Sequence, residues 1–173
     1  PASVAQARSP PAPRQGGSRG PGGVQKQLPA LIAELRATAP PGLPFRVLFQ
    51  DEGRFGRISD HRRCWAPLPA RPTVGSQVVR EYVHAFVALC PWRGQVASLI
   101  LPAADTECMS LFLAHTAAQF PGQFCVMVLD GAGWHGAKDL RVPEHMRLLF
   151  LPPYSPELNP VEHVWEHLRE NYF

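Results

Sequence analysis

The stretch FCVMVLD, residues 124–130, is an uninterrupted apolar run that ends in an acid. Because it lacks the polar alternation of a half-exposed strand, it predicts a strand buried on both faces, of the kind found in parallel sheets. The run RVLFQD, residues 46–51, also ends in an acid. Buried strands combined with helical segments predict an α/β fold, with a mixed central sheet flanked by helices.

The segments around these two runs supply the other elements of the predicted fold. The turn residues PWRG, 91–94, separate two β-rich runs, so the first three strands are expected to form an antiparallel meander. Asp105 is placed to cap the helix that follows them. The predicted strands are 45–52, 81–90, 94–102, 124–130 and 146–152, and the predicted helices are 28–40, 105–120 and 156–173, with a short helical link after residue 130.

The bulk composition indicates one globular domain. The chain has 173 residues, of which 45% are hydrophobic, and this is enough for a single core of ordinary size. No apolar run approaches the roughly 18 residues that span a bilayer, and the N-terminus has no secretory apolar segment. A cytoplasmic protein without membrane contact is therefore expected. The formal net charge of +3 is too small to indicate nucleic-acid binding by itself.

Residues 1–44 differ in composition from the rest of the chain. Up to about residue 28 they are rich in Pro, Gly, Ser and Arg and contain almost no large apolar side chains. Such a composition cannot offset the entropy of ordering by burial. We expect a disordered or linker segment that carries one short helix near its end.

The cysteines are far apart in the sequence and form no C-x-x-C pair, which argues against a zinc ribbon or a thioredoxin-like redox site. We expect them to be buried free thiols. They are Cys64, Cys90, Cys108 and Cys125.

Two of the predicted strands end in an aspartate, Asp51 and Asp130. If these strands are neighbours, the strand spacing of roughly 5 Å brings the two carboxylates close enough to share a cation. Glu162, at the start of the closing helix, would complete a site for two divalent metals. Oxygen ligands favour Mg²⁺ or Mn²⁺ over zinc. Caps and solvated turns are the alternative role for each of these acids.

Three segments, in this order, resemble the signature blocks of the mariner-like DDE transposases, particularly the bacterial insertion-sequence branch whose catalytic domain is called a DDE superfamily endonuclease. They are FQDEGRFG, LDGAGWH and LPPYSPELNPVEHVW, at residues 49–56, 129–135 and 151–165. The resemblance covers about residues 45–173. It implies that these residues form a catalytic domain with an RNase H-like fold.

The resemblance also implies a role for individual residues. The family's three catalytic acids fall on Asp51, Asp130 and Glu162, which would be the ligands of two Mg²⁺ or Mn²⁺ ions. His135 falls on a family position near the active site, where it would contact a substrate phosphate or orient a metal ligand. Asn159, as a cap, and the prolines around it would fix the start of the helix that presents Glu162.

A basic cluster follows Asp51 in the sequence. These arginines are candidates for contacts with DNA phosphates, and an exposed charged loop is the alternative. Trp134 is a candidate for stacking on a flipped base. The candidate substrate-binding residues are thus His135, Arg54, Arg57, Arg62, Arg63 and Trp134.

The function implied by the resemblance is that of a bacterial DNA transposase. It would cleave phosphodiester bonds at transposon ends and transfer the freed strand into target DNA. Its partners would be double-stranded DNA and a second copy of the chain, and it would be associated with the nucleoid when bound. Relatives carry helix-turn-helix domains before the catalytic domain and continue beyond the position of Phe173, so we expect a truncated protein. Gly131 replaces the Asn of many relatives.

Two other functions remain open from the sequence. One is a catalytically silent remnant that binds DNA or dimerises, and the other is a nuclease of the same fold that is not a transposase. Cleavage without preference for transposon ends would distinguish the latter.

Two acids close to the proposed ligands have competing roles. Glu52 is expected on the opposite face of its strand from Asp51, as a supporting or solvated group. Glu166 lies one turn after Glu162 and would replace it if that assignment were wrong.

Three further side chains of the closing helix have simpler explanations. His163 and His167 are spaced like a zinc pair, but the pattern HVWEH lacks the arrangement of the zinc-protease motif, so we expect them to face solvent. Trp165 is expected in the core, with base stacking as the alternative.

Overall fold

The computed structural model describes residues 27–56, 65–67, 69, 73, 81–153 and 155–172. The predictions for residues 1–26, for Arg57, Arg62 and Arg63, and for Cys64 lie outside this set. Among the described helices, none has the length and apolar character needed to cross a membrane.

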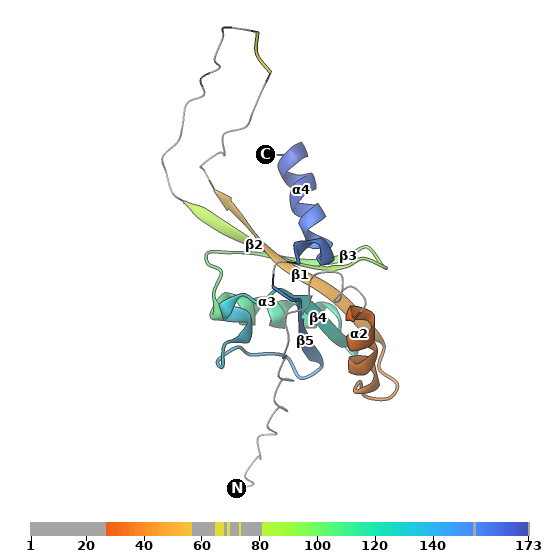
Figure 1. The fold of residues 1–173 in the computed structure, drawn as a ribbon. Helices are drawn as coiled ribbons and strands as arrows, with labels where there is room; N and C mark the ends of the chain where they lie inside the picture. Colours follow the sequence, from red (N-terminus) through yellow and green to blue (C-terminus); the bar gives the residue numbers. More distant parts are fainter. Residues whose placement is uncertain are drawn as a thin grey trace.

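A mixed sheet forms the centre of the described part of the chain. Its strands are β1 (Phe45–Gly56), β2 (Tyr82–Cys90), β3 (Gln95–Leu101), β4 (Phe124–Leu129) and β5 (Met146–Phe150). Their order in the sheet is β3-β2-β1-β4-β5 (Figure 1). β1, β2 and β3 pair antiparallel, which confirms the predicted meander. β4 pairs parallel with both β1 and β5, as the apolar run at residues 124–130 predicted.

The helices α2 (Leu28–Ala37), α3 (Thr106–Gln119) and α4 (Val161–Asn171) flank this sheet, and Figure 1 shows α3 and α4 on opposite sides of it. Each face of the sheet therefore has its own apolar cluster. The cluster on the α3 side includes Leu48, Phe86, Met127, Met109, Phe112 and Leu113. The cluster on the α4 side includes Val47, Phe49, Val128 and Trp165, with Ile32 of α2 at its edge. Because both faces are covered, β4 is buried along its whole length.

The helix α3 begins where the sequence predicts. The Asp105 carboxylate accepts a hydrogen bond from the Cys108 N–H at 2.8 Å, and this is the expected helix cap. Phe112 is fully buried and packs on Phe86, with ring centroids 5.5 Å apart. The free cysteines of the described residues are buried, as predicted; they are Cys90, Cys108 and Cys125.

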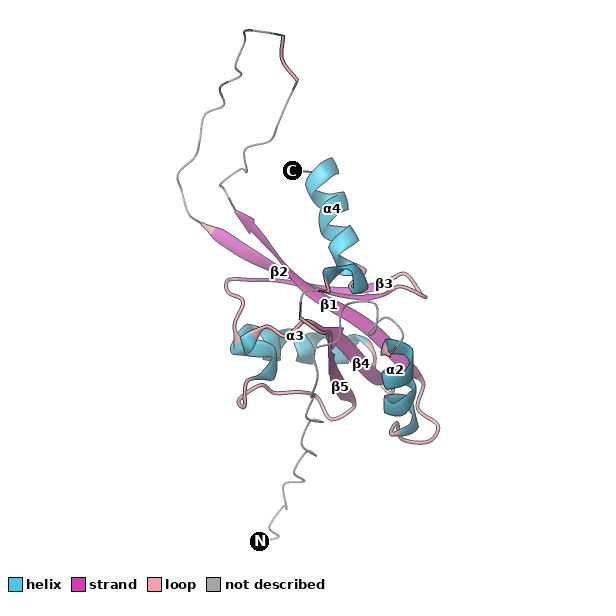
Figure 2. Ribbon diagram, in the orientation of Figure 1, coloured by secondary structure: helices cyan, strands magenta, loops and turns pink. Residues whose placement is uncertain are grey.

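The ends of β1 and β2 extend past the rest of the sheet as a short two-stranded arm, beyond the last pair of β2 with β3, His84 and Leu101. β1 pairs with β4 only over Phe45–Phe49, but it pairs with β2 as far as Gly56 opposite Tyr82. Figure 2 shows the two strands running on beyond their neighbours. Asp51 therefore lies just past the end of the β1–β4 pairing, where one edge of β1 is open.

The chain approaches α4 through a short 3-10 turn, η2 (Pro156–Leu158), so the closing helix begins later than the predicted residue 156. Asn159 anchors this start. Its Nδ2 donates to the backbone oxygen of Gln50 at 2.9 Å, and its Oδ1 accepts from the Val161 N–H at 3.2 Å. Asn159, the predicted cap, thus also ties α4 to the central strand. It lies two residues before the helix, and Pro160 is the residue directly before it.

The packing of α3 on the sheet gives a stability prediction. Phe112→Ala should lower the free energy of unfolding by about 3–5 kcal/mol, because it removes a buried ring and leaves a cavity. The neighbouring Leu111 is 52% exposed, so Leu111→Ala should change stability by less than about 1 kcal/mol. Urea denaturation followed by circular dichroism measures both. Equal losses for the two variants would mean that the packing of α3 is not as described.

Candidate active site

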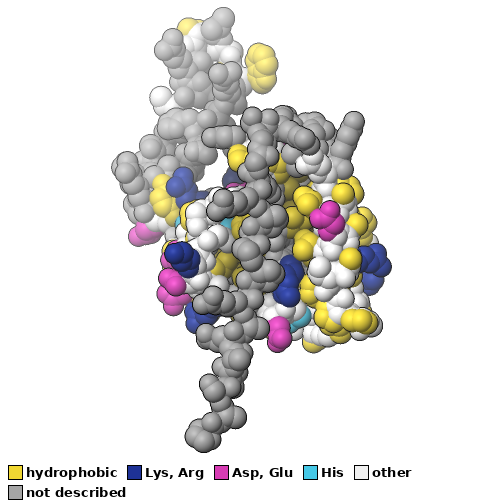
Figure 3. All heavy atoms as spheres, turned by 60° about the horizontal axis from the view of Figure 1, so that its bottom comes forward, with side chains coloured by type: hydrophobic (Ala, Val, Ile, Leu, Met, Phe, Trp, Pro, Cys, Tyr) yellow, Lys and Arg dark blue, Asp and Glu magenta, His cyan; other side chains and the backbone are white. Residues whose placement is uncertain are grey.

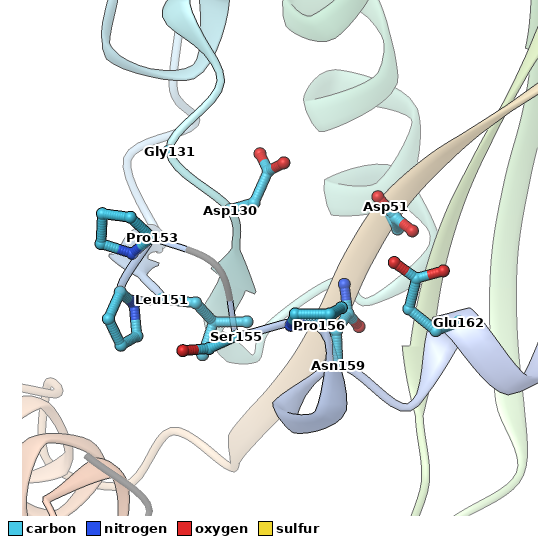
Figure 4. A pocket seen from close by; sticks show the side chains of 10 residues that line it. Asp51, Asp130, Gly131, Leu151, Pro153, Ser155, Pro156, Asn159 and Glu162 are labelled. Atoms are coloured by element: carbon cyan, nitrogen blue, oxygen red, sulfur yellow. The ribbon is translucent and has the colours of Figure 1, made fainter. Parts of the chain in front are cut away.

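A pocket of about 240 Å³ opens between β1, the end of β4 and the start of α4 (Figure 4). Asp51, Asp130 and Glu162 all line it, and each comes from a different element. The register of the parallel strands explains why the two aspartates meet: Phe49 pairs with Val128, and both acids lie two residues further on. The pocket is completed by Gly131, Leu151, Pro152, Pro153, Ser155, Pro156 and Asn159.

Asp51 and Glu162 form the crowded side of the pocket. In Figure 4 their carboxylates point toward one another, while Asp130 is set apart at the end of β4. Burial is the main reason that the pKa of Asp51 is raised from 3.8 to about 6, and the negative charge of Glu162 adds to the rise. A bound cation would relieve this repulsion.

Trp165 holds Asp51 from the side of α4. The ring is 2% exposed, which confirms the predicted core position, and its Nε1–H donates to Asp51 Oδ2 at 2.8 Å. This hydrogen bond opposes the rise in the pKa of Asp51. Gly53 makes room for the ring, because a Cβ at this position would lie 3.0 Å from Trp165 Cε3. The same Cβ would lie 2.8 Å from Phe55 Cε2, so a larger residue at position 53 would crowd both rings.

Asp130 is held by the loop that follows β4. This loop turns through a 3-10 segment, η1 (Gly133–Gly136), which returns His135 to a buried position beside Asp130. His135 Nδ1 lies 2.9 Å from Asp130 Oδ1 and 3.1 Å from its backbone oxygen. The Ala132 N–H donates to the same Oδ1 at 3.0 Å. The hydrogen bond from His135 is the main reason that the pKa of Asp130 lies below its usual value.

The other ring nitrogen of His135 meets Glu52. His135 Nε2 lies 2.9 Å from Glu52 Oε1, and the Glu52 side chain is 8% exposed on the α3 side of β1, opposite Asp51 as predicted. Burial by itself would lower the pKa of His135, but the hydrogen bonds to Asp130 and Glu52 outweigh it and raise that pKa from 6.5 to about 9. His135 is 1% exposed, which leaves no surface for a substrate phosphate. Its other predicted role, orienting a metal ligand, fits this position.

The donor set of the pocket suits a hard divalent cation. Its three acids offer only oxygen ligands, as Mg²⁺ and Mn²⁺ prefer. The hydrogen bonds to Asp51 and Asp130 leave lone pairs on both carboxylates for a cation. In the part of the chain that the structure describes, however, no three His, Cys, Asp or Glu side chains lie close enough together to form a metal-binding group. The three acids share the pocket, but Asp130 stands apart from the other two.

Two other candidates lie outside the lining of this pocket. Trp134 is half-buried against the apolar cluster on the α3 side, with its Nε1 3.4 Å from Glu52 Oε1. Arg54 is exposed at the base of the two-stranded arm, and its guanidinium lies 4.6 Å from the centroid of the Tyr82 ring. Base stacking by Trp134 and phosphate contact by Arg54 stay predictions.

The outer face of α4 carries the residues that competed with Glu162. Glu166 does not line the pocket; its exposed side chain lies 3.1 Å from His163 Nδ1. His163 and His167 are both exposed, as predicted. Glu162 is the acid of α4 that faces Asp51 in Figure 4.

Sequence reasoning missed two contacts that support the aspartates, the hydrogen bond from Trp165 to Asp51 and the link of Glu52 to His135. Trp165 was predicted to lie in the core, but the acceptor for its N–H was not predicted. A buried indole N–H usually has an acceptor. The predicted face of Glu52 is correct, but nothing in the sequence indicates its link to His135. Each contact joins residues more than 80 positions apart, 114 for Trp165 and Asp51 and 83 for Glu52 and His135, so no local pattern reveals it.

Comparison with known protein families gives one match that covers most of the chain. Residues 46–173 match the DDE superfamily endonuclease family. An uncharacterized protein of Sinorhizobium fredii is 47% identical over 92 residues, which is 53% of this chain and 68% of that protein.

Solved structures of similar fold include complexes of the Mos1 transposase. The mariner Mos1 paired-end complex with Mg is 15% identical with a TM-score of 0.60, covering 96% of this chain and 53% of that chain. The Mos1 strand transfer complex is 14% identical with a TM-score of 0.58, covering 96% and 52%. At this identity the likeness concerns the fold, and it confirms the predicted RNase H-like architecture. This chain spans about half the length of those transposase chains.

The raised pKa of Asp51 predicts how stability depends on pH without metal. The folded protein binds this proton more tightly than the unfolded chain, since about 6 exceeds 3.8. The stabilisation from the protonated carboxyl is complete below about pH 4 and is lost as the pH rises through about 6. Asp51→Asn should remove this loss, so the free energy of unfolding in EDTA should fall less between pH 4 and 7. Asp139→Asn, an exposed acid outside the pocket, is the control, and an unchanged pH profile in Asp51→Asn would contradict the assignment.

The neighbours of Asp51 should shift its pKa in opposite directions. Trp165→Phe removes the N–H donor and should raise the pKa further, whereas Glu162→Gln removes a negative charge and should lower it. Carboxyl ¹³C NMR titration of Asp51 measures both. Glu166→Gln, one turn further along α4, should leave the pKa unchanged. A shift in the same direction for Trp165→Phe and Glu162→Gln would rule out the described contacts.

Proposed function

This chain belongs to the DDE superfamily endonuclease family, and we propose that it cleaves phosphodiester bonds of DNA with the help of divalent cations held by Asp51, Asp130 and Glu162. The observation that carries this proposal is the meeting of these three acids in one pocket. They come from a central strand, from the end of the neighbouring strand and from the first turn of a helix. A group of acids from three separate elements is typical of a functional site when one of them, here Asp51, has a raised pKa.

The bound cations, two Mg²⁺ or Mn²⁺ ions in this proposal, would activate water for attack on the phosphorus and stabilise the leaving oxygen. The residues of the chain hold the ligands ready for them. Trp165 keeps Asp51 directed into the pocket through its N–H, and His135 does the same for Asp130. Asn159 ties the start of α4 to β1, which keeps Glu162 opposite Asp51.

We further propose that the reaction is DNA transposition, with cleavage at transposon ends followed by strand transfer. The support is the fold shared with Mos1 transposase complexes that are described as paired-end and strand transfer complexes. Because this chain spans only about half of those chains, recognition of particular ends and completion of both steps are proposed for the transposase as a whole. A homodimer that pairs two DNA ends is part of the same proposal.

Double-stranded DNA is the proposed substrate. On the face seen in Figure 3, basic and acidic side chains of the described residues are interspersed rather than gathered into a basic patch. A duplex is expected to approach from the pocket side, because the three proposed ligands line that pocket, and Arg54 is exposed at the base of the nearby two-stranded arm. Contacts of Arg54, Arg57, Arg62 and Arg63 with phosphates belong to this proposal.

A second candidate is a catalytically silent protein that binds DNA or dimerises. One observation favours it: among the described residues, no three His, Cys, Asp or Glu side chains lie close enough together to hold a metal ion. DNA affinity without metal-dependent scission would support it. Scission without preference for transposon ends would instead support a nuclease of another kind.

Plasmid nicking with Mg²⁺ or Mn²⁺ tests the leading proposal. Wild-type protein should convert supercoiled DNA to nicked or linear forms, and Asp51→Asn, Asp130→Asn and Glu162→Gln should each reduce cleavage to the EDTA background, because a cation ligand is lost. DNA affinity measured by fluorescence anisotropy should remain. Glu166→Gln and Asp139→Asn change exposed acids and should keep activity. Cleavage by Asp51→Asn at the wild-type rate would refute the assignment.

A further inference from the structure

The buried ring of His135 connects two acids of different elements. It lies between Glu52 on β1 and Asp130 in the loop after β4, at 2.9 Å from a carboxylate oxygen of each. His135 is 1% exposed and the Glu52 side chain 8%, whereas the Asp130 side chain is 59% exposed. The chain of contacts thus runs from the interior of the sheet to the exposed carboxylate in the pocket.

The inner end of this chain of contacts is built into the sheet and the apolar cluster on the α3 side. Glu52 pairs with Phe86 across β1 and β2, in the middle of the longest pairing of the sheet. The Trp134 ring packs edge-on against His135, with ring centroids 5.7 Å apart, and Trp134 itself packs on the apolar cluster beneath α3. Asp130, by contrast, lies beyond the end of β4 and has no strand neighbour. It is held by the contact of His135 with its carboxylate and backbone oxygen and by the hydrogen bond from the Ala132 N–H.

We propose that Glu52 and His135 are positioning residues that hold the carboxylate of Asp130 for cation binding. His135 and the Ala132 N–H engage Oδ1, which leaves Oδ2 as the oxygen available to a cation in the pocket. This inference rests on the proposed function, since it concerns a ligand of the proposed metal site. It adds a fourth acid, Glu52, that acts through His135 without touching the cation.

A purely structural role of the pair makes a different prediction. If Glu52 and His135 only stabilise the loop, removing their contact should lower the melting temperature and leave cation affinity unchanged in the folded protein. If they position Asp130, cation affinity should fall even at temperatures where the variant is fully folded. Loss of such supporting contacts typically weakens metal binding by about 10-fold to 100-fold.

The first test measures Mn²⁺ binding by electron paramagnetic resonance on the full chain. Glu52→Leu removes the acceptor for His135, and His135→Gln removes the pair of ring nitrogens that contact the two acids from opposite sides, so both should weaken binding by about 10-fold or more. Glu52→Gln keeps an acceptor oxygen and should restore most of the affinity. Gln123→Ala breaks a hydrogen bond to Arg46 at the opposite end of β4 and is the matched control. Wild-type affinity in Glu52→Leu and His135→Gln, or an equal loss in Gln123→Ala, would overturn the proposal.

The second test needs no metal. The Ala132 N–H donates to Asp130 Oδ1, so its hydrogen exchange reports whether that carboxylate is held in place. Exchange of Ala132 in EDTA should be faster in Glu52→Leu than in wild type, and unchanged in Glu52→Gln and Gln123→Ala. If wild-type protein binds no Mn²⁺, the proposed metal site is wrong, and the exchange data alone then decide whether Glu52 holds Asp130. Equal exchange in wild type and Glu52→Leu would rule out the positioning role.

Discussion

The parallel pairing of β1 with β4 is the constraint on which the rest of the structure depends. It places two apolar strands at the middle of the sheet, and both of their faces need cover, which α3 provides on one side and α4 with α2 on the other. The same pairing stops at Phe49 and Val128. Two residues later, both strands present an aspartate, and the pocket opens at that level.

Charge is the second organising factor, because the pocket gathers acids and shifts the pKa values of its two aspartates in opposite directions. Burial and Glu162 raise the pKa of Asp51, while a hydrogen bond lowers that of Asp130. Each aspartate has one aromatic N–H donor, from Trp165 or His135. These donors limit the cost of bringing anions together and fix where the carboxylates stand. A cation bound at the proposed site would relieve the remaining repulsion between Asp51 and Glu162.

Most of the fold could be predicted from the sequence because its signals are local. Periodicity and length identified the strands and α3, Asp105 marked a helix start, and the PWRG turn fixed the meander. The closing helix was predicted too early, because the prolines before Glu162 favour a 3-10 turn and delay the first α-helical turn. The family match over residues 46–173 agrees with the signature segments seen in the sequence.

The sequence by itself determined the acids: Asp51 and Asp130 end apolar runs, and Glu162 opens a helix, all features of short segments. Only the tertiary structure decided how they are held. Trp165 donates a hydrogen bond to Asp51 from a distant helix, and Gly53 leaves space for its ring. His135, which contacts Asp130, is in turn held by Glu52 of a distant strand. A hydrogen bond depends on the distance and direction between its donor and acceptor in space. For residues far apart in the sequence, these are set only by the strand register and the helix packing of the folded chain.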